Sequence, residues 1–107
     1  MILVSPCPEG VSSTHREILE FGYDTYQNVE KKVREGHLKN LTVAAHLVHV
    51  GRVIKERATG IIVTRGIKKE EAEKIGFIYC SEPQEALEVA FRLVGESPKI
   101  AIFSRGG

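Results

Sequence analysis

Four short runs of apolar residues constrain the fold of this chain more than any other feature. They cover Ile2–Ser5, Ile61–Thr64, Phe77–Cys80 and Lys99–Phe103. Each run is rich in Ile, Val, Phe or Tyr and lies close to Gly, Pro or Ser, which is typical of β-strands. None alternates cleanly between polar and apolar residues, and such continuous strands are expected where helices cover both faces of a parallel sheet.

Helical patterns occupy the segments between these runs. We expect helices over Ser13–Phe21, Asp24–Gly36, Leu41–Arg57, Ile67–Ile75 and Ser81–Val94. In the last of them Ser81 is predicted to cap the helix, with Gln84 reaching back to complete a capping box. The order of one strand, three helices and two consecutive strand–helix–strand units predicts parallel strands with right-handed connections.

The predicted fold is a small three-layer, Rossmann-like α/β domain with about four mainly parallel strands and helices on both faces. A length of 107 residues predicts a single domain over residues 1–107. The formal net charge of +1 gives no reason to expect nucleic acid or an anionic membrane as a partner. With no basic leader before its first apolar run, the protein is expected to be cytoplasmic. Its bias toward Lys, Arg and Glu is typical of thermophile proteins.

The segment Pro6–Ser13 is the candidate functional loop. It follows the carboxyl end of the first predicted strand, where open α/β sheets usually bind ligands. Free N–H groups and the dipole of the following helix favour an anion there, and Ser12 and Ser13 could add hydroxyl donors. The alternative is that Ser13 only caps the helix. The chain carries neither GxGxxG nor GxxxxGK[ST], so a standard dinucleotide or P-loop site is not expected.

The helix predicted over Leu41–Arg57 carries two candidate catalytic residues. His46 and His49 are three residues apart, a spacing that predicts both imidazoles on one face, for acid–base chemistry or a metal. The alternative is two histidines that are solvated or at the edge of the core. The apolar stripe of this helix is broad, which indicates a central helix or one covered by a partner.

Four further residues could bind an anion or a metal. Arg65 follows the second predicted strand, where its guanidinium could bind an anion, although an arginine in a loop is often only solvated. Cys7 and Cys80 lie near strand ends, and with His15 they could form a soft-metal site. Two cysteines do not make a disulfide framework, so the simpler expectation is two reduced thiols.

Three stretches together carry a family resemblance. They are the strand and Cys/acid/Gly turn in Ile2–Gly10, the alanine- and valine-rich helix Ala44–Glu56, and the elements from Ile61 to Phe103 that include Gly76 and the helix start Ser81–Leu87. In order and spacing these stretches resemble the C-terminal domain of the nickel-pincer-nucleotide-dependent lactate racemase family. The similarity spans nearly the whole chain.

The resemblance implies part of a racemase or isomerase. Members of that family have an N-terminal domain that holds the pincer cofactor and nickel, and a C-terminal domain that closes the cleft and contributes polar side chains to the substrate. This chain resembles the second domain and has no counterpart of the cofactor-bearing lysine segment. We therefore expect no cofactor in this chain alone, and a nickel-pincer nucleotide on a partner chain. Together they would act on a 2-hydroxy acid or similar small carboxylate.

The resemblance also places His46. Alignment on Arg52-Val53-Ile54 puts His46 where the racemase has a lysine and Val43 where it has a glutamine. A histidine can still move a proton, but the valine cannot form a hydrogen bond. The alternative to a partnered enzyme is a non-catalytic anion-binding or oligomerisation module, such as a homo-oligomer.

Overall fold

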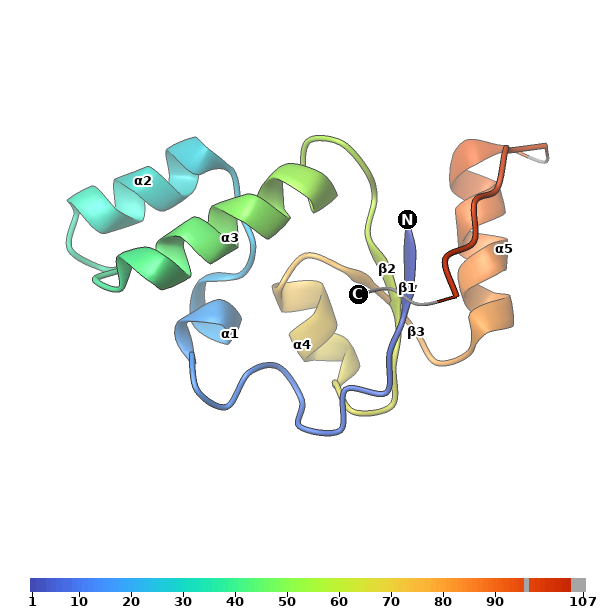
Figure 1. Ribbon diagram of the computed structural model, residues 1–107, viewed down its shortest axis with the longest axis horizontal. Helices are drawn as coiled ribbons and strands as arrows, with labels where there is room; N and C mark the ends of the chain where they lie inside the picture. Colours follow the sequence, from blue (N-terminus) through green and yellow to red (C-terminus); the bar gives the residue numbers. More distant parts are fainter. Residues whose placement is uncertain (96, 105–107) are drawn as a thin grey trace.

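A three-stranded parallel sheet lies at the middle of the computed structural model, which describes residues 1–95 and 97–104 (Figure 1). Its order is β1-β2-β3, with β1 at Ile2–Val4, β2 at Ile61–Val63 and β3 at Ile78–Cys80. The first residue of each strand pairs with the first residue of the next. The predicted α/β class is confirmed, and each of these strands is one residue shorter than its predicted run.

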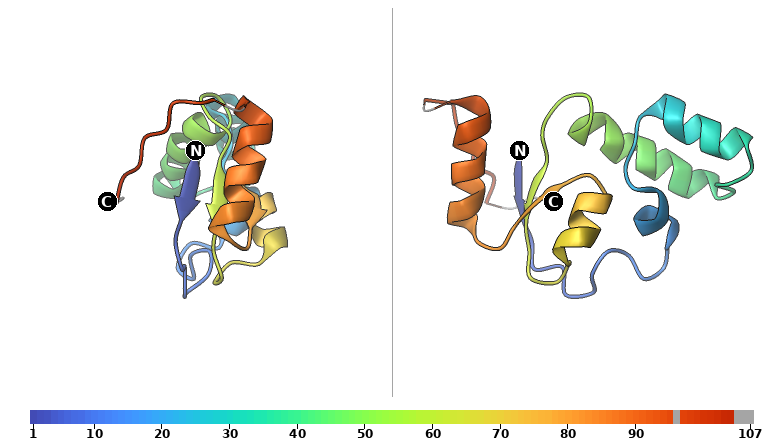
Figure 2. Two further views of the ribbon diagram at one scale, coloured as in Figure 1. Left: turned by 90° about the vertical axis from the view of Figure 1, so that its right-hand side faces the viewer. Right: turned by 180° about the vertical axis from the view of Figure 1, so that it is seen from behind.

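The helices lie on both faces of the sheet, as predicted (Figures 1 and 2). They are α1 at Glu17–Phe21, α2 at Tyr26–Arg34, α3 at Leu41–Ile54, α4 at Lys69–Lys74 and α5 at Pro83–Val94. Helix α5 covers one face, here called the back face, in contact with all three strands. Helices α1, α3 and α4 lie on the opposite, front face, and α2 packs against α3. None of the described helices has the length and apolar character needed to span a bilayer.

Two side-chain caps set where the long front helices begin. The side-chain oxygen of Asn40 accepts the N–H groups of Thr42 and Val43 at 3.1 and 3.2 Å, which starts α3 at the predicted residue. Thr25 caps α2 by accepting the N–H of Asn28 at 3.4 Å. Both caps satisfy N–H groups that have no partner within their helix.

The first helix is shorter than predicted, and Ser13 does not begin it. Helix α1 has five residues and no side-chain capping bond. Instead the Ser12 hydroxyl accepts the N–H of His15 at 3.1 Å, a local turn that competes with helical main chain. The first turn of α1 carries two acidic residues, so the helix dipole contributes little to anion binding near Ser12 and Ser13.

The cap of α5 also differs from the prediction. Pro83 is the first residue of the helix and Glu82 is its N-cap, without a side-chain capping bond. Ser81 lies one residue earlier, where its N–H and hydroxyl both donate to the Glu85 carboxylate, at 2.9 and 3.2 Å. The predicted reciprocal bond from Gln84 is therefore replaced by one from the next residue.

The fourth predicted strand is not part of the sheet. Within the described residues, the segment Lys99–Phe103 has no strand pairing, and Ile102 and Phe103 are 87% and 82% exposed. Figure 2 shows this segment running along the β1 side of the sheet. Its apolar pattern is that of a buried strand, but its main chain has no partner here.

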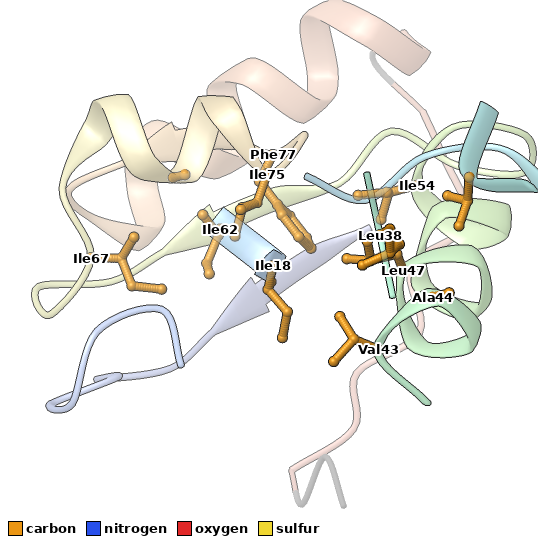
Figure 3. Close-up of a cluster of buried hydrophobic side chains, with 12 residues drawn as sticks. Ile18, Leu38, Val43, Ala44, Leu47, Ile54, Ile62, Ile67, Ile75 and Phe77 are labelled. Atoms are coloured by element: carbon orange, nitrogen blue, oxygen red, sulfur yellow. The ribbon is translucent and has the colours of Figure 1, made fainter. Parts of the chain in front are cut away.

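Buried side chains form one cluster on each face. The front cluster comprises Ile18, Val29, Leu38, Val43, Ala44, Leu47, Ile54, Ile62, Ile67, Ala72, Ile75 and Phe77 (Figure 3). The back cluster comprises Ile61, Val63, Cys80 and Ala86. Strand β2 supplies both, because successive strand side chains point to opposite faces. Each fully buried Val, Leu, Ile or Phe stabilises the fold by about 1.5–3 kcal/mol.

Candidate functional site

A cavity of about 680 Å³ lies on the front face between α3 and the sheet. Its polar lining residues are Cys7, Ser12, His15, Tyr23, Thr42 and His46, and the remaining lining is apolar. The loop after β1, the start of α1 and the central helix α3 therefore line one cavity beside the sheet.

Hydrogen bonds and close main-chain contacts fix the loop that follows β1 and lines the cavity. The N–H of Gly10 donates to the carbonyl of Cys7 at 2.9 Å, and the buried Thr64 hydroxyl donates to the carbonyl of Pro6 at 3.3 Å. Gly66 packs so closely against Cys7 that a Cβ at residue 66 would collide with the Cys7 carbonyl. The loop thus rests on the turn after β2, with backbone against backbone.

Two loop residues adopt unusual backbone angles. Cys7 has a φ of 42° and Ser12 a φ of 20°, both in a backbone region that residues other than glycine seldom occupy. Such conformations persist only where the surroundings fix them, and they are concentrated at ligand sites. The Cys7 thiol donates to the Ser5 hydroxyl at 3.3 Å, which orients it within the loop.

Tyr23 positions His46 in the cavity. The Tyr23 Oη lies 3.4 Å from His46 Nε2, and the two rings meet edge to face with centroids 5.6 Å apart. Burial raises the pKa of Tyr23, so the phenol stays protonated at neutral pH. When the phenol donates to Nε2, a neutral His46 carries its proton on Nδ1. Tyr23 also packs edge-on against Phe77, with centroids 6.3 Å apart.

His49 belongs to a different hollow. It lines a groove of about 410 Å³ between α2 and α3, together with Tyr26, Glu30 and Arg52. The structure therefore places His46 and His49 in different hollows. A step of three residues turns a helix by about 300°, so the two side chains diverge by about 60°, and α2 packs on the side that His49 occupies.

Of the three predicted anion-binding residues, the structure places only Ser12 in the cavity. Ser13 is exposed and lines neither of the two described hollows. Arg65 is also outside both, and its guanidinium is paired with the Glu82 carboxylate at 3.2 Å on the surface. An exposed pair of this kind contributes little to stability.

The cysteines do not come together. Both thiols are free, Cys7 packs at the edge of the front cluster, and Cys80 is buried in the back cluster. Burial, with a smaller contribution from the Glu85 carboxylate, raises the pKa of the Cys80 thiol. Among residues 1–95 and 97–104, no three His, Cys, Asp or Glu side chains gather as a metal site would require.

Tyr23 is a polar residue of the cavity that the sequence does not single out. Tyr23 lies just after Gly22, whose φ of 69° turns the chain at the end of α1. No local pattern indicates that a tyrosine in this connection contacts a histidine 23 residues later. The sequence indicates only that Tyr23 follows a glycine that ends a helix. That position predicts a turn, but it does not predict which residues the tyrosine contacts.

Comparison of the chain with protein-family models, curated protein sequences and solved structures finds no match.

Proposed function

We propose that this chain is the substrate-binding half of a two-part enzyme that resembles lactate racemase, acting with a cofactor-bearing partner chain on a 2-hydroxy acid or similar small carboxylate. The observation that carries this proposal is the convergence of Ser12, His15 and His46 on one cavity. His46 stands where the resemblance places a substrate-facing lysine, and it lines this cavity, which supports the proposal.

The polar side chains that line the cavity include donors suited to a 2-hydroxy acid. The Ser12 oxygen already accepts the His15 N–H, which leaves the hydroxyl proton to donate to a carboxylate. The His46 Nδ1–H can donate to the second oxygen or to the 2-hydroxyl group. Val43, at the glutamine position, adds no hydrogen bond, so His46 has the main polar role on α3.

The nickel-pincer nucleotide belongs to the partner chain in this proposal, and it would supply the redox chemistry at the substrate carbon. The residues of this chain bind and orient the carboxylate and exclude water. Tyr23 holds the His46 ring at a fixed angle, which favours one protonation site.

A finer proposal concerns the sheet. The carbonyl of Met1 accepts from Ile61 and the N–H of Ser5 donates to Val63, so alternate residues of β1 face β2. The main-chain groups of Ile2 and Val4 consequently face the open edge. We propose that Lys99–Phe103 pairs there as a fourth parallel strand, which would complete a Rossmann-like sheet.

The connection through α5 supports this placement. The chain moves from β1 to β3 with its helices on the front face, and returns through α5 on the back face toward β1. The return crossover from β3 toward β1 runs in the opposite direction across the sheet and on the opposite face. Because both are reversed, it keeps the same handedness as the crossovers from β1 to β3. Slow hydrogen exchange at the Ile2 and Val4 amides, lost on deletion of residues 97–107, would support the fourth strand; fast exchange in the intact chain would reject it.

Titration with sodium lactate, followed by NMR chemical shifts and by thermal unfolding, tests the binding part of the proposal. Ser12→Ala and His46→Ala should each weaken binding by about tenfold, because each removes a bond to a charged group. Ser13→Ala is the matched control, since Ser13 is adjacent but outside the cavity. Equal effects of Ser12→Ala and Ser13→Ala, or no response to lactate, would contradict the proposal.

Two further measurements separate the enzyme from a non-catalytic module. Racemisation of lactate by the chain together with a co-purified, nickel-containing partner supports the enzyme. If sodium phosphate and sodium sulfate bind as tightly as lactate, and no partner co-purifies, an anion-binding module accounts better for the site.

A further inference from the structure

The cavity is much larger than the smallest substrate that the proposed function would allow. A lactate-sized molecule displaces only a few water volumes of about 30 Å³ each, on the order of 100 Å³. The cavity has about 680 Å³, within the range of roughly 300–1,000 Å³ that is usual for sites of larger organic ligands. Lactate alone would leave most of it filled by water against apolar walls.

The lining of the cavity is mainly apolar, with a few polar groups among it. Besides Ser12 and His46 it includes Leu3, Val50, Ile62 and Phe77, which belong to β1, α3, β2 and the segment before β3. Figure 3 shows Ile62 and Phe77 gathered on the sheet side, across from the side chains of α3. A ligand that fills this space therefore needs a polar head and an extended apolar body.

The charges around the cavity narrow the class further. None of the described residues that line it is Asp, Glu, Lys or Arg. Hydrogen-bond donors such as the Ser12 hydroxyl and the His46 imidazole can match one carboxylate. A second charge on the ligand would lie unpaired against apolar walls, which is costly.

We propose that the ligand of this cavity is a 2-hydroxy monocarboxylate with a large apolar side chain, aliphatic or aromatic, rather than lactate itself. Its carboxylate lies at Ser12 and His46, and its side chain extends between Val50 of α3 and Phe77. The inference rests on the proposed function for its polar head, and on the volume and lining of the cavity for its apolar tail.

A series of probes tests this assignment on the intact chain. Binding of lactate, 2-hydroxybutanoate, 2-hydroxyhexanoate and phenyllactate is measured by calorimetry, with malate as the doubly charged comparison. Affinity should rise by about fourfold for each added methylene group that reaches the apolar wall. Malate should bind at least about tenfold more weakly than 2-hydroxyhexanoate.

A cavity-filling variant supplies the control. Val50→Phe places a ring in the apolar part of the cavity, so it should abolish the gain in affinity from chain length. Ala45→Ser, on α3 but outside this cavity, should leave the whole series unchanged. If Val50→Phe does not fold, the chain-length series on the unmodified protein still decides.

The outcomes distinguish this inference from the proposed function. Equal affinity for lactate and 2-hydroxyhexanoate would overturn the inference and leave the proposed function standing. Binding of none of the hydroxy acids would overturn both. Equal binding of hexanol and 2-hydroxyhexanoate would also overturn both, because the polar side chains would then contribute nothing.

Discussion

On the back face of the sheet, α5 packs directly against the strands, whereas on the front face a cavity separates α3 from them. The back cluster needs only Ile61, Val63, Cys80 and Ala86, because a small side chain on α5 lets helix and strands approach closely. The front cluster contains more and larger side chains and still leaves about 680 Å³ open. The number of buried side chains in a cluster therefore does not determine how closely the helices pack against the sheet.

The front helices are held by main-chain contacts at one place. In the connection between α1 and α2, the Tyr23 N–H donates to the Ile75 carbonyl at 3.3 Å and the Asp24 N–H to the Leu47 carbonyl at 3.4 Å. Gly51 of α3 lies directly against Asp24. This connection ties α3 to the end of α4, and the hydrogen-bonded residues Tyr23 and Ile75 line the cavity that remains open between α3 and the sheet.

The largest expected effect comes from breaking that tie. In Gly51→Ala the new methyl group would collide with the Asp24 backbone, which cannot move aside as a side chain would. We expect a loss of about 3 kcal/mol or more in the free energy of unfolding, measured by urea denaturation. Gly36→Ala is the control, because a Cβ at residue 36 would meet no other atoms and only its φ of 78° would strain the alanine. We expect it to lower the free energy of unfolding by about 1 kcal/mol. Equal losses would show that the tie is unimportant.

A pair of overpacking substitutions compares the two faces directly. Ala86→Leu inserts carbon atoms into the closed back cluster, where it should cost about 2–3 kcal/mol. Val50→Phe adds a similar number of carbon atoms on α3, but into the cavity, so a change of less than about 1 kcal/mol is expected. Chemical denaturation of both variants measures the two changes in the free energy of unfolding. A larger loss of stability in Val50→Phe than in Ala86→Leu would refute the contrast between the faces.

A smaller effect concerns the charge at the tie. Partial burial by itself raises the pKa of Asp24, but bonds from Asn28, Thr25 and Lys32, at 2.9, 2.8 and 3.1 Å, outweigh it and hold the pKa below its ordinary value. Asp24→Asn should therefore lower the free energy of unfolding by about 1–2 kcal/mol at pH 7.

The pH dependence of this effect has a definite sign. Because the folded pKa of Asp24 is lowered, its contribution is complete above the unfolded pKa of about 3.9 and is lost as the pH falls through the folded pKa. Urea denaturation of the wild type and Asp24→Asn should converge below about pH 4. A constant difference across that range would show that the carboxylate charge is not involved.

The smallest expected effect is at the cavity. Tyr23→Phe removes the bond to His46 and should cost about 0.5 kcal/mol. Since burial raises the folded pKa of Tyr23, its contribution is complete below the unfolded pKa of about 10 and is lost as the pH rises further. Tyr23→Phe should lack that alkaline loss, and its His46 imidazole should show a changed ratio of Nδ1–H to Nε2–H forms by NMR. An unchanged ratio would remove Tyr23 as the positioning residue.

The sequence predicts an element of this fold correctly where the composition of the segment itself is enough to specify it. The run Ile61–Thr64 gives the buried strand β2 at Ile61–Val63, because a continuous β-branched run is typical of a strand covered on both faces. Lys99–Phe103 is also rich in apolar residues but forms no strand within the described residues, because a strand requires pairing as well as an apolar sequence. Composition reports a preference for burial, and pairing is decided by the rest of the chain.

The candidate site is predictable only in part. The positions of Ser12 and His46 follow from the loop after the first strand and from the central helix. The separation of His46 from His49 depends on where α2 packs, and the contact of Tyr23 with His46 joins segments 23 residues apart. Periodicity along one helix carries no information about either.

The contact between Gly66 and the Cys7 carbonyl also bears on how this sequence can diverge. Any side chain at residue 66 would displace the loop that closes the cavity, so residue 66 can change only if the loop around Cys7 changes with it. Variation at these two segments should therefore be coupled, although they are far apart in the chain. In related sequences, a glycine two residues after Thr64 would mark those that retain this loop shape, and its loss would mark those whose binding site has been remodelled.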